Sequence, residues 1–173
     1  MRHVAPVLLS VFLAGCSCPF MDGVQHPELK PEKGTQQEPA KVLGTMPATT
    51  WSTTTVESAV PDKDGVKAPR KGEVVTLTGE VIDVSCYLQL GKHGAAHKAC
   101  GQKCAKNGNP IGLLTAEGCV YLLMAEEHHP RRDGDTKSLT DALIEHMADI
   151  VKVTGTEASL NGQKALFVSG FAK

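Results

Sequence analysis

Aromatic residues are scarce in this chain, since Phe, Trp and Tyr make up only 4% of its 173 residues. Few side chains are therefore available to stack on nucleic-acid bases or sugar rings. The chain also has no excess of charge of one sign, because 18 Lys and Arg stand against 19 Asp and Glu, for a formal net charge of -1. Proteins that bind nucleic acid or anionic lipid usually present a strongly basic face. We therefore expect neither nucleic acid nor an anionic lipid surface as a partner.

The sequence also lacks the short motifs that mark several enzyme classes. It contains no GxSxG elbow, no Gly-rich phosphate loop and no CxxCH haem attachment. A thiol oxidoreductase usually presents CxxC at a helix start, where backbone dipoles lower the pKa of the first thiol, whereas this chain has CxxxC at Cys100 and Cys104. We expect a protein that is not an enzyme, and a thiol oxidoreductase remains an alternative.

No apolar run near the start of the chain is long enough to span a bilayer. Val4–Ala14 falls short of the roughly 20 residues that a membrane helix needs. Because it follows Arg2 and precedes small residues, it predicts a signal peptide over residues 1–15.

The signal ends in Leu13-Ala14-Gly15-Cys16, which resembles the lipobox of bacterial lipoproteins. This resemblance implies cleavage before Cys16, a covalent lipid on Cys16 and a membrane-anchored protein of the cell envelope. Ser17, rather than Asp, follows the cysteine, which would imply the periplasmic face of the outer membrane in a Gram-negative organism. An ordinary secretory signal with an incidental cysteine is the alternative.

Residues 16–70 are rich in Pro, Thr, Gln, Lys and Glu and show no sustained apolar period. Such a composition does not bury a core, so we expect a disordered tether that lifts a domain from the membrane. Trp51 is the exception within this segment. It is interpreted as a lone aromatic of the tether, with docking on the domain as the alternative.

Residues 71–173 are expected to form one domain, mainly β with helices. The predicted elements are a strand over Glu73–Val84 that bends at Gly79, a helix over 94–107, a hairpin over 110–124, a helix over Ser138–Met147, and strands over Asp149–Thr156 and Ala165–Val168. This order is that of a small five-stranded Greek-key barrel of the OB type, with a cysteine-bearing helix after strand 1 and a helix between strands 3 and 4. An open α+β sheet is the alternative.

The cysteines and histidines of this domain gather in its first part. On a helix, His97, Cys100 and Cys104 (i, i+3, i+7) share one face, and Cys86 lies at the end of the strand before it. Three thiolates and one imidazole make a tetrahedral soft-metal set that suits Zn(II), and two or three thiolates suit Cu(I). The hypothesis for function is therefore a metal-binding module.

Two further residues extend this metal hypothesis. Asp83 and His93 are expected as reserve ligands or as groups that orient an imidazole.

The same cysteines also fit a structural interpretation. Cys86 could pair with one helix cysteine and Cys119 with the other, which would staple a small exported interaction domain whose partner is another envelope protein. His128 and His129 are interpreted as part of a solvated loop and His146 as a surface histidine.

The second half of the chain also shows a resemblance. Gly79–Asp83, Cys86, His97, Cys100, Cys104 and Pro110–Leu114 are similar to a group of uncharacterised exported bacterial proteins with an OB-like domain. The resemblance implies the fold and the position of the site, and it implies no activity.

Overall fold

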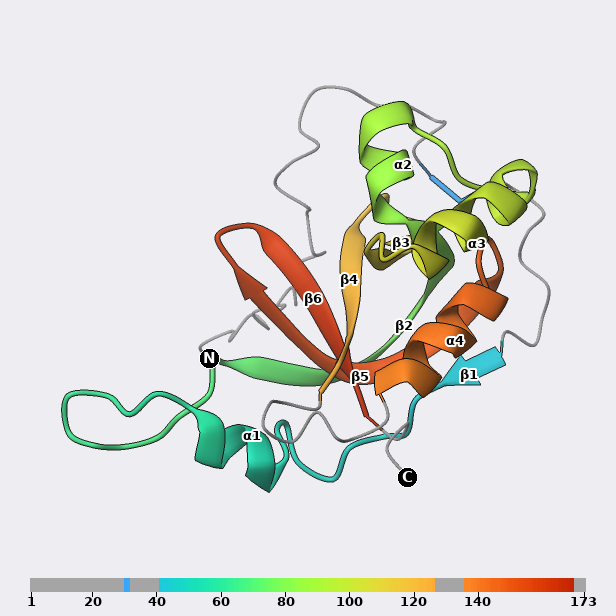
Figure 1. Cartoon of the computed structure of the whole chain (residues 1–173). Coiled ribbons are helices and arrows are strands. Elements are labelled where there is room, and N and C mark those ends of the chain that lie inside the picture. Colours follow the sequence, from blue (N-terminus) through green and yellow to red (C-terminus); the bar gives the residue numbers. More distant parts are fainter. Residues whose placement is uncertain (1–29, 32–40, 127–135, 170–173) are drawn as a thin grey trace, which may run out of the picture.

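The computed structural model describes residues 30–31, 41–126 and 136–169 of the chain. Its sheet has the strand order β1-β5-β2-β3-β4-β6, and an additional pairing of β5 with β6 closes five of these strands into a barrel (Figure 1). The strands are β1 (Lys41–Leu43), β2 (Gly72–Asp83), β3 (Ile111–Thr115), β4 (Val120–Ala125), β5 (Ile150–Leu160) and β6 (Gln163–Val168). The helices are α1 (Thr53–Ser58), α2 (Val84–Leu90), the 3-10 turn η2 (Ala95–His97), α3 (Lys98–Lys106) and α4 (Thr136–Glu145).

The strand pairing is that of an OB-type Greek key. β2 pairs antiparallel with β3 and β5, β3 pairs antiparallel with β4, and β4 pairs parallel with β6. The helix α4 stands between β4 and β5 in the chain, and the cysteine-bearing helices follow β2. The predicted barrel is therefore confirmed, and an open α+β sheet is excluded because the sheet closes on itself.

Two glycines lie where strands change partners. Gly79 is in register with Thr115 of β3 and also with Val151 of β5. A Cβ on Gly79 would lie 2.6 Å from the carbonyl oxygen of Leu114, too close for any side chain. Gly155 occupies the matching place on β5, where it is in register with both β2 and β6. Both glycines thus permit the close backbone approach that a barrel corner requires.

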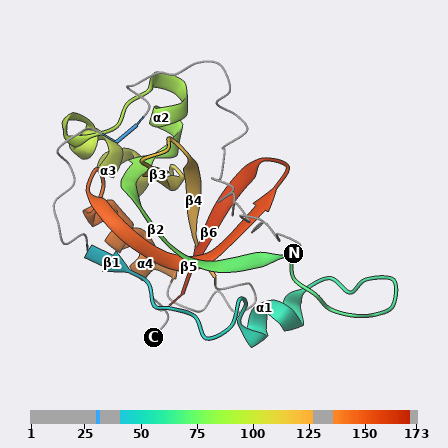
Figure 2. The ribbon, with the colours of Figure 1, turned by 180° about the vertical axis from the view of Figure 1, so that it is seen from behind.

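The barrel interior is filled by aliphatic side chains from all five strands, and α4 covers one side of it. Leu139, Leu143 and Met147 are 3%, 2% and 1% exposed, so the stripe expected at i+4 spacing faces the core. α2 and α3 lie next to each other at one end of the barrel, and α1 lies beyond its other end (Figures 1 and 2). Both α2 and α3 contact β2, so these two short helices lie beside the end of that strand.

The structure differs from the expected tether over residues 41–70. β1 pairs in parallel with β5, and Trp51 packs edge-on against Phe167 with ring centroids 5.3 Å apart. The Trp51 indole nitrogen also donates a hydrogen bond to the Arg70 carbonyl at 2.8 Å. The docking interpretation of Trp51 is therefore the correct one, and the fold begins well before Lys71.

A buried carboxylate fastens this N-terminal segment to the barrel. Glu126, only 6% exposed, accepts hydrogen bonds from the Ser52 backbone N–H at 2.7 Å and from the Thr55 hydroxyl at 3.0 Å. Its other oxygen accepts from the Ser169 hydroxyl at 2.6 Å. The segment is held by backbone pairing and a few polar contacts, which need no apolar period, and composition alone therefore did not reveal it.

Two local differences concern the cysteine region. Cys86 does not end a strand but lies in the first turn of α2, and the expected helix over 94–107 is divided into η2 and α3.

Residues 1–29, Cys16 among them, and His128–His129 lie outside the described residues. Among the helices of the described part, none is long and apolar enough to span a membrane.

Candidate metal site

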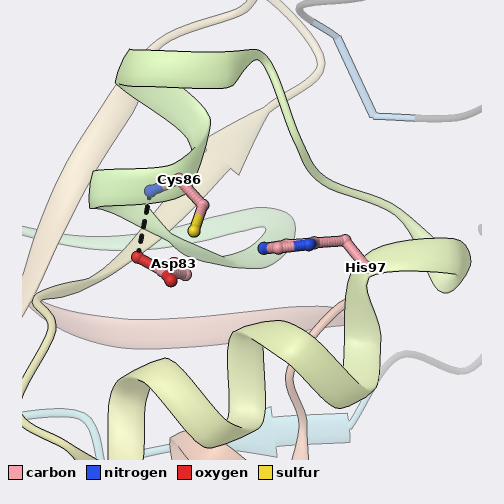
Figure 3. A group of neighbouring side chains, drawn as sticks. All are labelled: Asp83, Cys86 and His97. Atoms are coloured by element: carbon pink, nitrogen blue, oxygen red, sulfur yellow. Dashed lines mark hydrogen bonds between the residues drawn. The ribbon is translucent and has the colours of Figure 1, made fainter.

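Asp83 ends β2 and starts α2. Its Oδ1 accepts hydrogen bonds from the backbone N–H groups of Ser85 at 2.9 Å and Cys86 at 3.2 Å, as an N-cap residue does. Gly91, with φ of 64°, ends the helix in the left-handed conformation. Because Cys86 is in the first turn of α2, its sulfur lies beside the carboxylate that caps the helix (Figure 3).

His97 approaches the same place from the other side. It ends the 3-10 turn that leads into α3, and its side chain points toward the Cys86 sulfur (Figure 3). The residue is 8% exposed, and its Nε2 has no hydrogen-bond partner among the described residues. A buried polar atom without a partner costs about 1–3 kcal/mol, so it requires an explanation.

Together Asp83, Cys86 and His97 form a group of possible metal ligands. One carboxylate oxygen, the sulfur and one imidazole nitrogen all lie within 4.8 Å of one another. Cys104 adjoins this group, since its thiol makes hydrogen bonds with Cys86 and Asp83. Cys100 adjoins Cys104 but is exposed to solvent.

α3 brings its residues to the site by packing closely on the chain around α4. A Cβ on Gly101 would lie 3.0 Å from Met147 Cγ, so glycine allows the two segments to approach. The Gln102 side chain donates to the Ile144 carbonyl at 3.0 Å, and Lys98 pairs with Asp149 at 2.6 Å.

The buried face of this segment is therefore His97, Gly101 and Ala105. The face that the sequence suggested, with Cys100 and Cys104 beside His97, is turned partly toward solvent. The division between η2 and α3 and the contact at Gly101 together set this rotation.

The protonation of the site follows from these contacts. Burial acts to raise the pKa of Asp83, but hydrogen bonds from Cys86, Asn109 and Cys104 outweigh it and hold the pKa below the usual 3.8. The hydrogen bond to Asp83, together with burial, raises the pKa of Cys86 to about 12. Burial also raises the pKa of Cys104. Without metal, Cys86 is thus a protonated thiol at neutral pH, unlike the thiolate of a thiol oxidoreductase.

The cysteines are not paired as the structural interpretation expected. Cys86, Cys100 and Cys104 have free thiols. Cys119 is disulfide-bonded, and because the other three are free its partner is none of them. It is 5% exposed in the main core, away from the candidate ligands.

His93, expected as a reserve ligand or orienting group, has a different partner. Its Nδ1 lies 3.1 Å from Oε2 of Glu80, and the two side chains are 7% and 0% exposed. Sequence reasoning missed Glu80. The sequence did contain a signal, because Glu80 directly precedes the apolar residues Val81 and Ile82 of a β-branched run.

His146 is less exposed than expected. Its side chain is 15% exposed, and its Nδ1 lies 3.2 Å from Asp149 Oδ2.

Comparison of the chain with known protein families, with curated proteins and with solved structures finds no match.

Proposed function

We propose that the domain binds a soft transition-metal ion, Zn(II) or Cu(I), through Cys86, His97 and Cys104, with Asp83 as a further oxygen ligand or an immediate neighbour. The single observation that carries this proposal is the buried His97 Nε2, which has no partner among the described residues and belongs to a side chain that points toward Cys86 and Asp83. A metal ion would supply the missing partner and compensate the cost of burying the nitrogen.

The donor set favours Zn(II) over Cu(I). Thiolate and imidazole suit both ions, but a carboxylate oxygen is a frequent zinc ligand and a poor ligand for Cu(I). Asp83 Oδ1 accepts hydrogen bonds from two backbone N–H groups, whereas Oδ2 accepts none from the backbone and a long one of 3.3 Å from the Asn109 side chain. Oδ2 is therefore the oxygen that a zinc ion would contact.

Metal binding must displace thiol protons. In the metal-free form the Cys86 thiol donates a hydrogen bond to the Asp83 carboxylate, and a metal ion would take the place of that thiol proton between the sulfur and the carboxylate. The module would buffer, sense or hand on the ion rather than catalyse a reaction.

A second candidate function rests on the contact between the Cys86 and Cys104 thiols. Thiol–disulfide exchange with a disulfide of another molecule, which would be reduced to two thiols, would form a disulfide that joins α2 to α3 and would leave a stapled interaction domain of the envelope. This candidate leaves His97 Nε2 without a partner, so we prefer metal binding.

The test is metal and thiol content on one sample. The exported chain is purified without chelator, and its mass is measured under native and denaturing conditions beside its zinc and copper content. We expect one stoichiometric ion and free thiols at Cys86 and Cys104, with the ion lost in Cys104→Ser and in His97→Leu. Ala99→Ser, an exposed change on the same helix, is the matched control. A disulfide between Cys86 and Cys104 without an ion would support the stapled domain instead.

We also propose that the chain is a lipoprotein of the cell envelope, anchored through a lipid on Cys16. The support is the Leu13–Cys16 ending of the N-terminal apolar run. Labelled palmitate should enter the wild-type chain and not Cys16→Ala. Labelling of both would locate the lipid elsewhere, and labelling of neither would indicate an ordinary secretory signal.

A further inference from the structure

Three cysteine thiols form a path from solvent to the buried ligand group. Cys100 is exposed, whereas Cys104 and Cys86 are partly buried. Cys100 and Cys104 are four residues apart on α3, so their side chains lie on the same face one turn apart. The Cys104 thiol makes hydrogen bonds with both Cys100 and Cys86.

A buried metal site needs such a path if its ion is to exchange. Release of a thiolate-bound ion into water breaks several strong bonds before new ones form, whereas replacement of one ligand at a time keeps the ion coordinated throughout. Asp83 and His97 are buried and Cys86 is partly buried, so an incoming ligand has little direct access to them from solvent. Cys100 is the one thiol of the three that is exposed.

The charge around Cys100 indicates the form in which the ion arrives. α3 carries three lysines and no carboxylate. Lys98 is paired with Asp149, whereas Lys103, one turn from Cys100, and Lys106 are exposed. A positive surface repels a bare hydrated cation and attracts an anionic complex. Metal bound by thiolates of a small molecule or of an acidic protein would be such a complex.

We propose that Cys100 is the exchange ligand of the metal site and that its partner is an anionic metal–thiolate complex. This inference rests on the proposed metal binding. Cys100 forms a bond to the ion as one donor thiolate leaves, and the Cys100 proton passes to that leaving thiolate. Cys104, Cys86 and His97 then bind the ion as the donor's remaining thiolate leaves. One of the two thiol protons passes to that thiolate, and the other passes to Cys100 as it is released. No atom changes oxidation state.

The test compares the rate of transfer with the affinity at equilibrium. The full exported chain, reduced and metal-free, is mixed with Zn(II) or, in parallel, Cu(I), each as its glutathione complex, and loading is followed by stopped flow. In Cys100→Ser we expect transfer to be slower by about tenfold or more, equivalent to ~1.4 kcal/mol of barrier, while the dissociation constant changes by less than about threefold. Ala99→Ser should transfer at the wild-type rate. Lys103→Gln should slow transfer from the anionic complex and reduce its dependence on salt.

Two results would overturn the inference. An unchanged transfer rate in Cys100→Ser would show that the ion reaches the site without Cys100. A large loss of affinity in the same variant would make Cys100 a permanent ligand. In both of these results the wild-type chain still binds metal. If the proposed function itself were wrong, the wild-type chain would bind neither Zn(II) nor Cu(I).

Discussion

Two buried pairs of histidine and carboxylate lie close together at the end of β2, and they differ in one respect. Glu80 and His93 are 3.1 Å apart, and the second oxygen of Glu80 accepts a hydrogen bond from the Gly94 N–H at 2.5 Å. Asp83 and His97 are also buried, but the Nε2 of His97 has no partner among the described residues. The first pair is a closed polar contact, and the second is open toward a ligand.

The difference shows that burial of a histidine beside a carboxylate does not by itself mark a binding site. A saturated pair such as Glu80–His93 holds a loop in place, because buried polar groups are stable when each has a partner. In the group of Asp83, Cys86 and His97, the buried Nε2 of His97 lacks a hydrogen bond, and this destabilises the metal-free chain. Binding of a metal ion to Nε2 would remove that destabilisation. The comparison predicts that substitutions in the Glu80–His93 pair lower the stability of the metal-free chain, whereas substitution of His97 lowers the affinity for metal.

Glu80→Ala should give the largest effect, and the effect should be on stability. The change leaves His93 and the Gly94 N–H buried without Glu80, and removal of one member of a buried pair costs about 3–5 kcal/mol. Urea denaturation of the metal-free chain measures it. Glu80→Gln, which keeps an acceptor for Gly94, should lose less. If Glu80→Ala were as stable as the wild type, the pair would not be structural.

His97→Leu should produce the opposite result. Leucine fills a similar space and removes the unpaired nitrogen, so the metal-free chain should be as stable as the wild type or more so. Its affinity for zinc should fall by about 100-fold or more, because a lost ligand costs more than a lost supporting contact. Calorimetric titration measures the affinity. A zinc affinity equal to that of the wild type would remove His97 from the site.

The pH dependence of metal binding should follow the thiols. Because the pKa of Cys86 is raised to about 12, the sulfur is protonated at neutral pH, and a metal ion must compete with that proton. Affinity should therefore weaken as the pH falls, by about tenfold per pH unit for each thiol proton displaced. Titrations between pH 6 and 8, a range of roughly two units around neutrality, would measure the slope. A slope of zero would mean that no thiol binds the ion.

The raised pKa of Cys86 predicts the opposite pH dependence for the stability of the metal-free chain, which should fall as the pH rises. A folded pKa above the ordinary 9.0 means that the neutral Cys86 thiol stabilises the fold fully below pH 9.0. That contribution should disappear as the pH rises toward about 12.

Asn109→Ala should give the smallest effect. The Asn109 amide donates to both Asp83 oxygens at 3.3 Å, which is long for a hydrogen bond. Its loss should weaken zinc binding by only about tenfold or less, since Asn109 supports a ligand from outside the site. Asn107→Ala, an exposed neighbour, is the control and should bind as the wild type does.

Much of the fold was determined by the sequence itself. Alternating β-branched runs, the i+4 stripe of Leu139, Leu143 and Met147, and the two corner glycines encode strands and helices through local periodicity and backbone freedom. Because these signals depend on near neighbours in the chain, they can be recognised without a structure. The region of the site was determined in the same way, by the density of cysteine and histidine between Asp83 and Cys104.

Only the tertiary structure decided which of these residues meet. Asp83 and Cys86 come from one side and His97 from the other, and the position of His97 depends on the turn η2 and on the contact of Gly101 with Met147, 46 residues further along the chain (147 − 101). The assignment of His93 to Glu80 and the docking of Trp51 on Phe167 are likewise contacts between distant segments. Periodicity reports the face of an element and not its neighbour, since the neighbour is set by packing across the whole domain.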